Sequence, residues 1–293
     1  MSIEARIQSN RSLKELSTLG IGGPARYFIA ISATSEMIEL MKYLKLHPHP
    51  YWVIGKGSNS LFSDRGFDGL IILNQIQFLE WEEGLLHVGA GFSFSLLGAK
   101  TARKGWGGLE FASGIPGTVG GAIYMNAGAN GKETADHLVE VTVVTPKGKL
   151  LTRKKEDLKF SYRTSIFQKE EGIIVSARFQ LMPKPSAREE QLQIIDYRTK
   201  TQPYGEKSAG CFFRNPKGKV GAGALIEQCG LKGKRIGGAE VSTLHGNFII
   251  NRGEATTEDV LQLVKVMKQT VFEQTGQSLE LEIRPIPYRL EEG

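Results

Sequence analysis

The sequence predicts an α+β protein with more than one domain. Short apolar strands and amphipathic helices follow one another without the regular strand–helix repeat of a doubly wound sheet. The last third differs in character, since a long capped helix there precedes a strictly alternating segment. With 293 residues, of which 40% are hydrophobic, the chain is long enough for two or three cores.

The first part of the chain mixes helices, strands and turns. Apolar residues at helical spacing predict helices over 36–46 and 94–103. Short apolar runs predict strands over 51–54, 70–73, 85–88 and 172–181. The turn Pro146-Lys147-Gly148 predicts a hairpin with strands at 139–145 and 149–152.

A break at Pro183-Lys184-Pro185-Ser186 is the most plausible linker to the last third. Beyond it we expect helices over 188–201 and 221–229 and strands over 235–241 and 247–251. Thr256 caps a predicted helix that runs to about Thr275, because Asp259 favours a helix N-terminus and Gly276 stops the helix.

The segment Leu-Glu-Leu-Glu-Ile-Arg at 279–284 alternates strictly between apolar and charged residues. Such alternation predicts a strand with Glu280, Glu282 and Arg284 on one face. That face is expected to meet solvent by default.

Composition and charge favour a small anionic partner. The net charge is +6 and the pI about 9.2. The densest basic cluster, 153–155, is followed at once by two acidic residues, so we interpret it as a solvated face.

No apolar stretch approaches a membrane span, and the start has no apolar region of a secretory signal. The chain has two cysteines, which lack C-x-x-C spacing. This cysteine content suits a protein of the reducing cytoplasm better than a scaffold held by disulfides.

A glycine-dense run extends from Gly105 to Gly131 and contains nine of the 35 glycines. Glycine loses much conformational entropy on folding, so this density needs a reason, and close approach of backbone amides to a phosphate-bearing ligand is the usual one. Residues 114–121 lack both the G-x-G-x-x-G pattern and the P-loop lysine. A nicotinamide-type Rossmann site and a P-loop are therefore disfavoured.

A second glycine loop, Gly55-Lys56-Gly57-Ser58-Asn59-Ser60, follows the strand at 51–54. The two loops together fit a long ligand with a central diphosphate, such as FAD. The structural alternative for the longer run is a chain of tight turns that packs one strand against another.

Several side chains could take part in chemistry. Cys211 is either a small core residue or a thiol that donates a proton, since a thiol with a pKa of about 8.5 is mostly protonated at neutral pH. Arg163 either anchors a carboxylate or forms a structural ion pair. Cys229 is interpreted as a core residue of its helix. His245 has no second histidine at metal-ligand spacing, so no metal is expected.

Taken in order, these segments resemble the family of UDP-N-acetylenolpyruvoylglucosamine reductases over nearly the whole chain. The matching stretches are 18–25, 55–59, 112–129, 161–167, 210–216, 225–233 and 279–284. The resemblance implies peptidoglycan precursor synthesis and an α+β fold with a two-part FAD-binding region like that of vanillyl-alcohol oxidase. The implied divisions are 1–75 with the tail 284–293, 76–183, and a substrate-binding domain at 184–283.

The resemblance also implies a mechanism. NADPH reduces FAD, which passes a hydride to the substrate's enol ether, while Arg163 and Glu282 stabilise the charge beside the substrate carboxylate. Cys211 takes the position of the proton donor, where the family commonly has serine. Only 43 residues separate Phe167 from Cys211, so the chain resembles the shorter class without the extra tyrosine loop.

The resemblance implies non-covalent FAD binding by the two glycine loops and the residues that follow the longer one. The implied FAD contacts are Gly55, Lys56, Gly57, Ser58, Asn59, Ser60, Ser113, Gly114, Ile115, Pro116, Gly117, Thr118, Gly120, Gly121, Asn126 and Gly128. Asn215 and Lys232 match sugar-nucleotide contacts, with Tyr124 and His245 as weaker candidates. We expect a monomer that binds small molecules.

Two other functions stay open at this point. Another FAD enzyme of the same fold, such as an alcohol or sugar oxidase, often tethers FAD through a histidine, but none lies between Val88 and Asp136. A nucleic-acid-binding protein would need interleaved aromatic and basic residues on one face, and no such run is evident.

Overall fold

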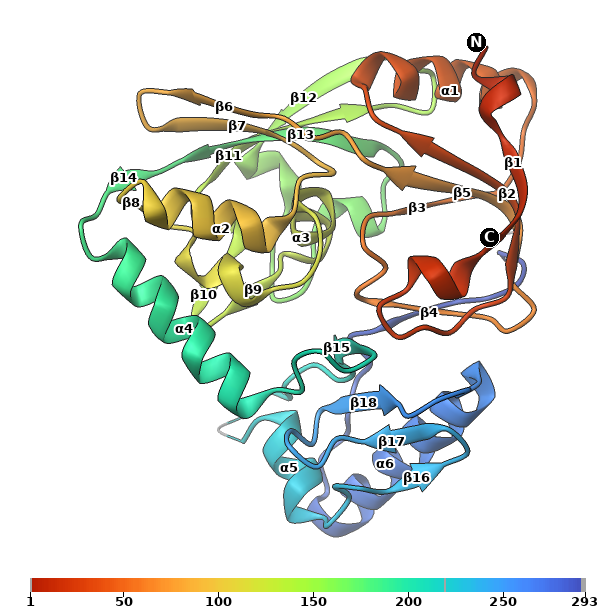
Figure 1. The fold of residues 1–293 in the computed structure, drawn as a ribbon, viewed down its shortest axis with the longest axis vertical. Helices are drawn as coiled ribbons and strands as arrows, with labels where there is room; N and C mark the ends of the chain where they lie inside the picture. Colours follow the sequence, from red (N-terminus) through yellow and green to blue (C-terminus); the bar gives the residue numbers. More distant parts are fainter. Residues whose placement is uncertain (1, 219, 291–293) are drawn as a thin grey trace. The chain divides into compact units, whose positions relative to one another are not determined.

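The computed structural model describes residues 2–218 and 220–290 and contains two compact units (Figure 1). The first unit comprises Met1–Ser9, Tyr27–Gly55 and Leu70–Tyr197. The second comprises Asn10–Arg26, Lys56–Gly69 and Arg198–Gly293. Met1 and residues 291–293, which belong to the predicted first division and its tail, lie outside the described residues.

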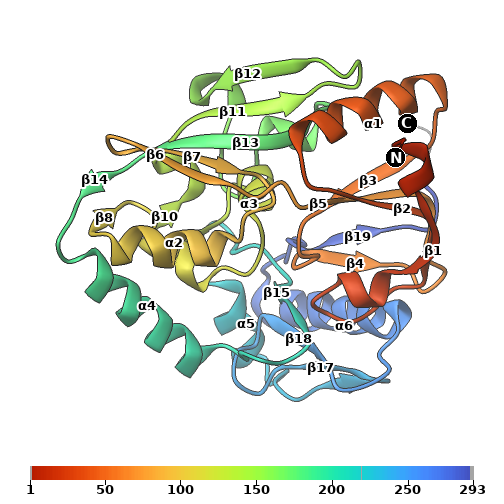
Figure 2. The same cartoon turned by 45° about the horizontal axis from the view of Figure 1, so that its top comes forward.

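A five-stranded antiparallel sheet dominates the first unit, in the order β12-β11-β13-β7-β6. Its strands are β6 (Leu79–Glu82), β7 (Leu85–Gly89), β11 (Leu138–Val144), β12 (Leu150–Lys154) and β13 (Ile173–Gln180). Helices α2 (Phe94–Arg103) and α3 (Val119–Met125) lie on one face, as Figures 1 and 2 show.

Both faces of this sheet are buried at its centre. On β13, Ile174 and Ala177 join the core with α2 and α3, whereas Ile173 and Val175 join a second core with Met37 of α1 (Thr34–Leu46). A strand covered on both faces reads as a continuous apolar run, which explains the sequence of β13.

A second sheet has the order β1-β2-β5-β3. Its strands are β1 (Gln8–Ser12), β2 (Pro24–Ile31), β3 (Tyr51–Ile54) and β5 (Phe67–Asn74). In the first unit β3 runs parallel to β5, with Tyr51 opposite Leu70. Two short pairs complete the unit, β8 (Trp106–Gly107) with β14 (Met182–Pro183) and β9 (Gly128–Ala129) with β10 (Lys132–Glu133). Helix α4 (Ala187–Thr201) follows β14.

The second unit is built on an antiparallel sheet in the order β15-β18-β17-β16. These strands are β15 (Ser208–Cys211), β16 (Arg235–Ile236), β17 (Ala239–Val241) and β18 (Phe248–Asn251). Helices α5 (Ala222–Gln228) and α6 (Thr257–Thr275) supply apolar residues to its core. A parallel pair joins β4 (Ser60–Phe62) to β19 (Arg284–Ile286).

The predicted α+β class is confirmed, and the helix with the strongest local signals follows its prediction closely. Thr256 Oγ1 accepts a hydrogen bond from the N–H of Asp259 at 3.0 Å, and Asp259 Oδ2 accepts one from the N–H of Thr256 at 2.9 Å. Gly276 ends α6 with a φ of +70°. These contacts lie within one turn of the chain, so the sequence alone specifies them.

Two strand predictions were wrong. The expected strand at 235–241 is a tight hairpin of β16 and β17, because Gly237 adopts a φ of +51° between them. The alternating segment 279–284 forms only a bridge at Leu281, and its strand begins at Arg284. Phe212 O accepts hydrogen bonds from the N–H groups of both Glu282 and Ile283, a pattern that interrupts the ladder of a strand.

Candidate functional site

The two predicted glycine loops meet at Gly55 in the first unit. Gly55 directly follows β3, and a Cβ atom there would lie 2.2 Å from Thr118 Oγ1. No real Cβ contact is that short, so only glycine lets the chain pass Thr118 at this point. The structure therefore brings the start of the shorter loop against the longer run.

Thr118 caps α3, and the amides of the first turn of this helix bind the protein itself. Thr118 Oγ1 accepts from the N–H of Gly121 at 3.4 Å, while the N–H of Gly120 donates to Ala90 O at 2.8 Å. A Cβ at Gly120 would lie 3.1 Å from that of Ala90, whereas one at Gly121 would, among the residues that the structure describes, meet only Thr118 Oγ1, at 3.6 Å. Glycine at 120 thus allows the start of α3 to pack against Ala90, whereas glycine at 121 leaves open space beside the helix.

Three glycines of the run allow close packing against other segments of the chain. Added Cβ atoms at Gly107, Gly108 and Gly128 would lie under 3.0 Å from Lys184, His137 and Lys132 respectively. The alternative of closely packed turns therefore accounts for these three glycines.

Ser113, in the 3₁₀ turn Glu110–Gly114, carries a different signal. Its Oγ is buried and has no hydrogen-bond partner within the part of the chain that the structure describes. Buried hydroxyls normally have a partner, so this group fits a polar ligand. Ile115, Pro116 and Gly117 link this turn to Thr118. The unpaired hydroxyl and the open face at Gly121 fit FAD at this loop.

Asn126 ends α3 with a φ of +43° and is fully buried. Its Nδ2 donates to Ser161 O at 3.0 Å, and its Oδ1 accepts from the N–H of Ala135 at 3.1 Å. The amide therefore ties the end of α3 to the segment that carries Arg163.

Arg163 occupies a turn closed by two backbone hydrogen bonds between Ser161 and Thr164, of 3.0 and 3.1 Å. Its φ is +55°, a left-handed conformation that few residues other than glycine and asparagine adopt. Its Nη2 donates to Gly128 O at 2.9 Å. The first unit thus brings Arg163 together with Gly128, and Asn126 holds the same turn at Ser161.

In the second unit, the loop Lys56–Ser60 packs against the segment that carries Glu282. A Cβ at Gly57, whose φ is +60°, would lie 2.1 Å from Leu16 O. Asn59 Nδ2 donates to Glu282 O at 3.2 Å, and Asn59 O accepts from the N–H of Arg284 at 3.1 Å. Ser60 then opens β4 opposite Arg284.

Cys211 and Glu282 lie on neighbouring backbone segments, and both side chains are half-buried. Phe212, the residue after Cys211, accepts a hydrogen bond at its carbonyl from the N–H of Glu282 at 2.8 Å. Phe213 forms a bridge with Leu281. The structure therefore joins two of the three predicted catalytic residues in the second unit, and Arg163 belongs to the first.

Asn247 holds this arrangement and was not identified from the sequence. Its Oδ1 accepts from the N–H of Phe213 at 2.9 Å and its Nδ2 donates to Phe213 O at 2.8 Å. Its own carbonyl accepts from the N–H of Phe212 at 2.9 Å. Asn247 precedes β18 directly, and no local pattern marks an asparagine that binds a distant backbone.

Lys232 and His245 are linked through Glu227, another residue that the sequence analysis did not single out. Glu227 Oε2 lies 3.0 Å from Lys232 Nζ, and Oε1 accepts from the N–H of Gly246 at 3.1 Å. Burial raises the pKa of Glu227, but these two partners outweigh it and the pKa is lowered overall. Burial lowers the pKa of His245, whose Nδ1 accepts from the N–H of Asn247 at 3.1 Å.

The remaining predicted substrate residues have identifiable backbone roles. Asn215 is exposed, and its Oδ1 accepts from the N–H of Ala222 at 3.0 Å at the start of α5. Tyr124, in α3, is half-buried, and its carbonyl accepts from Ser165 Oγ at 2.8 Å. Asn215 belongs to the second unit and Tyr124 to the first.

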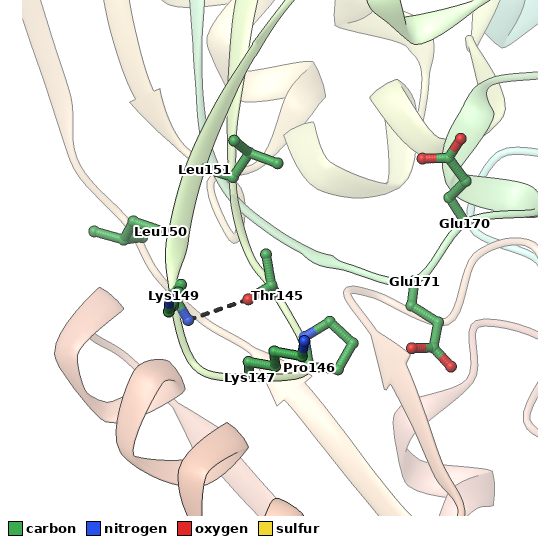
Figure 3. Close-up of a pocket in the computed structure, with 8 residues that line it drawn as sticks. All are labelled: Thr145, Pro146, Lys147, Lys149, Leu150, Leu151, Glu170 and Glu171. Carbon is green, nitrogen blue, oxygen red and sulfur yellow. Dashed lines mark hydrogen bonds between the residues drawn. The ribbon is translucent and has the colours of Figure 1, made fainter.

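A pocket lies beside the hairpin of β11 and β12 (Figure 3). Its lining residues are Thr145, Pro146, Lys147, Lys149, Leu150, Leu151, Glu170 and Glu171. None of the predicted site residues is among them. Within residues 2–218 and 220–290, no group of three or more His, Cys, Asp or Glu side chains could hold a metal ion, and no helix is long and apolar enough to span a membrane.

Residues 25–153 match the family described as FAD binding domain. Residues 202–286 match the C-terminal domain of UDP-N-acetylenolpyruvoylglucosamine reductase. The first match includes Gly55, Ser113 and the whole glycine run, where the unpaired hydroxyl and the open face lie. Fold and site together define an FAD-dependent oxidoreductase.

Relatives narrow this class to one family. The UDP-N-acetylenolpyruvoylglucosamine reductase of Protochlamydia amoebophila is 58% identical over 100% of this chain and 98% of its own length. That of Chlamydia trachomatis serovar A is 50% identical over 97% of each chain. The crystal structure of the reductase (MurB) from Thermus caldophilus has a TM-score of 0.82 at 38% identity, covering 96% of this chain and 99% of that one. The chain belongs to the UDP-N-acetylenolpyruvoylglucosamine reductase family.

Proposed function

We propose that this chain reduces UDP-N-acetylglucosamine enolpyruvate to UDP-N-acetylmuramate with NADPH as the reductant. The observation that carries the proposal is the hydrogen bond from the N–H of Glu282 to Phe212 O, which ties Glu282 to the residue after Cys211. A thiol and a carboxyl group on adjacent segments of one unit suit proton delivery beside a developing negative charge.

Binding of FAD is assigned to the residues of the two glycine loops and to those that follow the longer one. When bound, FAD supplies the hydride chemistry, from NADPH and toward the enol-ether double bond. In the first unit the proposed contacts are Gly55, Ser113, Gly114, Ile115, Pro116, Gly117, Thr118, Gly120, Gly121, Asn126 and Gly128. In the second they are Lys56, Gly57, Ser58, Asn59 and Ser60. The unpaired Ser113 hydroxyl supports this assignment most directly.

The proposed role of Arg163 follows from where charge builds up. Hydride addition places negative charge on the carbon next to the substrate carboxylate, and a guanidinium that binds this carboxylate stabilises the charge. The hydrogen bond from Arg163 to Gly128 O at 2.9 Å holds the guanidinium in a defined orientation. Preorganised charge of this kind needs no rearrangement during the reaction.

Cys211 and Glu282 complete the proposed chemistry. The Cys211 thiol donates its proton to the carbon that carries the negative charge, and a thiol is a stronger acid than the serine hydroxyl that the family commonly has. Glu282 acts beside the developing anion, so we expect it to be protonated or to share a hydrogen bond there.

The sugar-nucleotide contacts are assigned to Asn215 and Lys232, with Tyr124 and His245 as further candidates. The Lys232 ammonium suits a diphosphate, and its ion pair with Glu227 at 3.0 Å restrains it. We keep the three divisions 1–75 with 284–293, 76–183 and 184–283 as proposals. We also propose a monomer that acts in the cytoplasm, in keeping with Cys211 and Cys229, which are not joined in a disulfide.

NADPH consumption with UDP-N-acetylglucosamine enolpyruvate tests the activity. Cys211→Ser should retain turnover, whereas Cys211→Ala should lose substrate reduction by about 10²- to 10⁴-fold. Reduction of FAD by NADPH should survive in both variants. Normal turnover of Cys211→Ala would remove Cys211 from the proton-donor role. A flavin that stays attached after denaturation would contradict non-covalent binding and favour an oxidase of the same fold.

A further inference from the structure

Gln168 binds the backbone of Arg163 directly. Its Nε2 donates to Arg163 O at 2.9 Å and to Tyr124 O at 3.0 Å, and the same atom lies 3.7 Å from Met125 Sδ. A side-chain amide carries two N–H donors, so the two carbonyls use both of them. Gln168 is half-buried at the end of the 3₁₀ turn Ile166–Gln168.

The carbonyl that Gln168 binds belongs to a residue in an unfavourable conformation. Arg163 has a φ of +55°, which glycine adopts easily and other residues rarely do. Such a conformation persists only where the surroundings hold it, and it occurs often at functional sites. Hydrogen bonds across the turn at Ser161 and Thr164 fix its base, whereas the bond from Gln168 fixes Arg163 itself.

The second carbonyl relates this turn to α3. Tyr124 O lies in the last turn of α3, so the Gln168 amide joins that helix end to the backbone of Arg163. Its bond to Arg163 O acts on the same residue whose guanidinium donates to Gly128 O at 2.9 Å. A shift of the Arg163 backbone would therefore move the guanidinium.

We infer that Gln168 is a positioning residue for the reductase reaction: it holds Arg163 in the left-handed conformation that aims its guanidinium at the substrate carboxylate. This inference rests on the proposed catalytic role of Arg163. Gln168 touches neither substrate nor FAD in this assignment, and its effect passes entirely through Arg163.

The decisive experiment is a double-mutant cycle on the FAD-loaded full chain. Gln168→Met keeps the length of the side chain and removes both donors. The readout is the single-turnover rate at which the reduced enzyme reduces UDP-N-acetylglucosamine enolpyruvate. We expect Gln168→Met to lower this rate by about 10- to 100-fold, the scale of a misplaced catalytic group. Combined with Arg163→Ala, the same substitution should change the rate by less than about twofold.

Controls separate positioning from general damage. Gln180 is exposed and its Nε2 donates to Leu181 O at 3.3 Å in the same unit, so Gln180→Met makes the same substitution away from Arg163 and should leave the rate unchanged. Gln168→Lys retains N–H donors on a long side chain and should recover part of the loss. Reduction of FAD by NADPH should stay within about twofold of the original rate in Gln168→Met, as expected for a substitution that leaves FAD in place.

The outcomes are distinct. A normal rate in Gln168→Met, or an equal loss with and without Arg163, would overturn the inference. Equal losses in Gln168→Met and Gln180→Met would also overturn it, since they would indicate general destabilisation. If Arg163→Ala alone reduces the substrate at the normal rate, the proposed catalytic role of Arg163 is contradicted. The inference about Gln168, which rests on that role, then falls with it.

Discussion

The side-chain amide of Asn247 pairs with both backbone groups of Phe213, accepting from its N–H at 2.9 Å and donating to its carbonyl at 2.8 Å. Asn247 is 2% exposed and Phe213 is 1% exposed, so water cannot replace these hydrogen bonds. A buried polar group without a partner costs more than a hydrogen bond contributes when it forms. The pair therefore fixes the segment between Cys211 and Arg214 in the core of the second unit.

Asn247→Ala should lower the free energy of unfolding by about 2–4 kcal/mol, because it leaves the N–H and carbonyl of Phe213 unpaired. Chemical denaturation followed by circular dichroism measures this change. Gln269→Ala is the matched control, since it removes an exposed amide on α6 whose Nε2 donates to Glu273 Oε1 at 2.9 Å. Equal stability of the two variants would contradict the importance of the Asn247 pair.

Alkylation by iodoacetamide should inactivate the enzyme through Cys211. Cys229 is the matched thiol, and burial raises its pKa, so it forms the reactive thiolate less readily. Cys229→Ala should be inactivated as fast as the original chain, while Cys211→Ser should keep its activity under the same treatment. Loss of activity in Cys211→Ser would show that another group is the target. Mass spectrometry of the alkylated protein identifies the modified residue.

Gly55→Ala should destabilise the first unit by about 1–3 kcal/mol, as overpacked core substitutions do. The added Cβ would lie 2.2 Å from Thr118 Oγ1 and 2.8 Å from Thr118 Cγ2, so rotation of the hydroxyl alone does not relieve the clash. Adding Thr118→Ala should recover part of this loss, although that change alone removes a helix cap worth about 1 kcal/mol. Thermal unfolding of the three variants measures the coupling. Simple addition of the two losses would rule out a direct clash.

Gly121→Ala separates cofactor binding from folding. Within the described part of the chain an added Cβ there would contact only Thr118 Oγ1, at the ordinary distance of 3.6 Å, so the protein itself accommodates it. Alanine is the better helix former, and the variant should be at least as stable. If FAD occupies the open face, the variant should bind it at least about tenfold more weakly, as expected for a steric loss of about 1.4 kcal/mol. Titration of the FAD-depleted protein with FAD measures the affinity, and unchanged binding would place FAD elsewhere.

Stability at acidic pH should depend on Glu36. The hydrogen bond from Arg6 lowers the pKa of Glu36 from 4.5 to about 2. A carboxyl group with a lowered folded pKa stabilises the protein above its unfolded pKa, and this contribution disappears as pH falls from about 4.5 to about 2. Glu36→Gln should flatten the stability profile in that window relative to the original chain. Identical profiles for Glu36→Gln and the original chain would contradict this assignment.

Features with local causes were predicted well from the sequence. The α6 helix is specified by Thr256, Asp259 and Gly276, which act within one turn of its ends. The hairpin of β11 and β12 follows from the turn Pro146-Lys147-Gly148. Alternation failed as a guide at 279–284, because a carbonyl from Phe212, distant in sequence, takes two successive N–H groups there.

The glycine run shows the same division. Its density indicated a phosphate-bearing ligand, and together with the second glycine loop it predicted FAD, which the matched FAD-binding domain confirms. Only the folded structure shows which glycines allow close packing of other protein atoms and which have open space beside them. Gly120 lies against Ala90 and Gly108 against His137, whereas Gly121 stays open. No count of glycines distinguishes these cases, since each depends on a neighbour brought in by folding.

The sequence by itself determined the fold class, the family and the residues proposed for chemistry, because all three follow from residue types and from their spacing along the chain. Only the tertiary structure decided how those residues are held. The amides of Asn247 and Gln168 hold the segments of Cys211 and Arg163 through backbone groups. Almost every residue type carries a backbone N–H and carbonyl, so a hydrogen bond to the backbone requires no particular residue there. Such a bond therefore leaves no pattern in the sequence. Such contacts become visible only when folding brings a donor and an acceptor within about 3 Å.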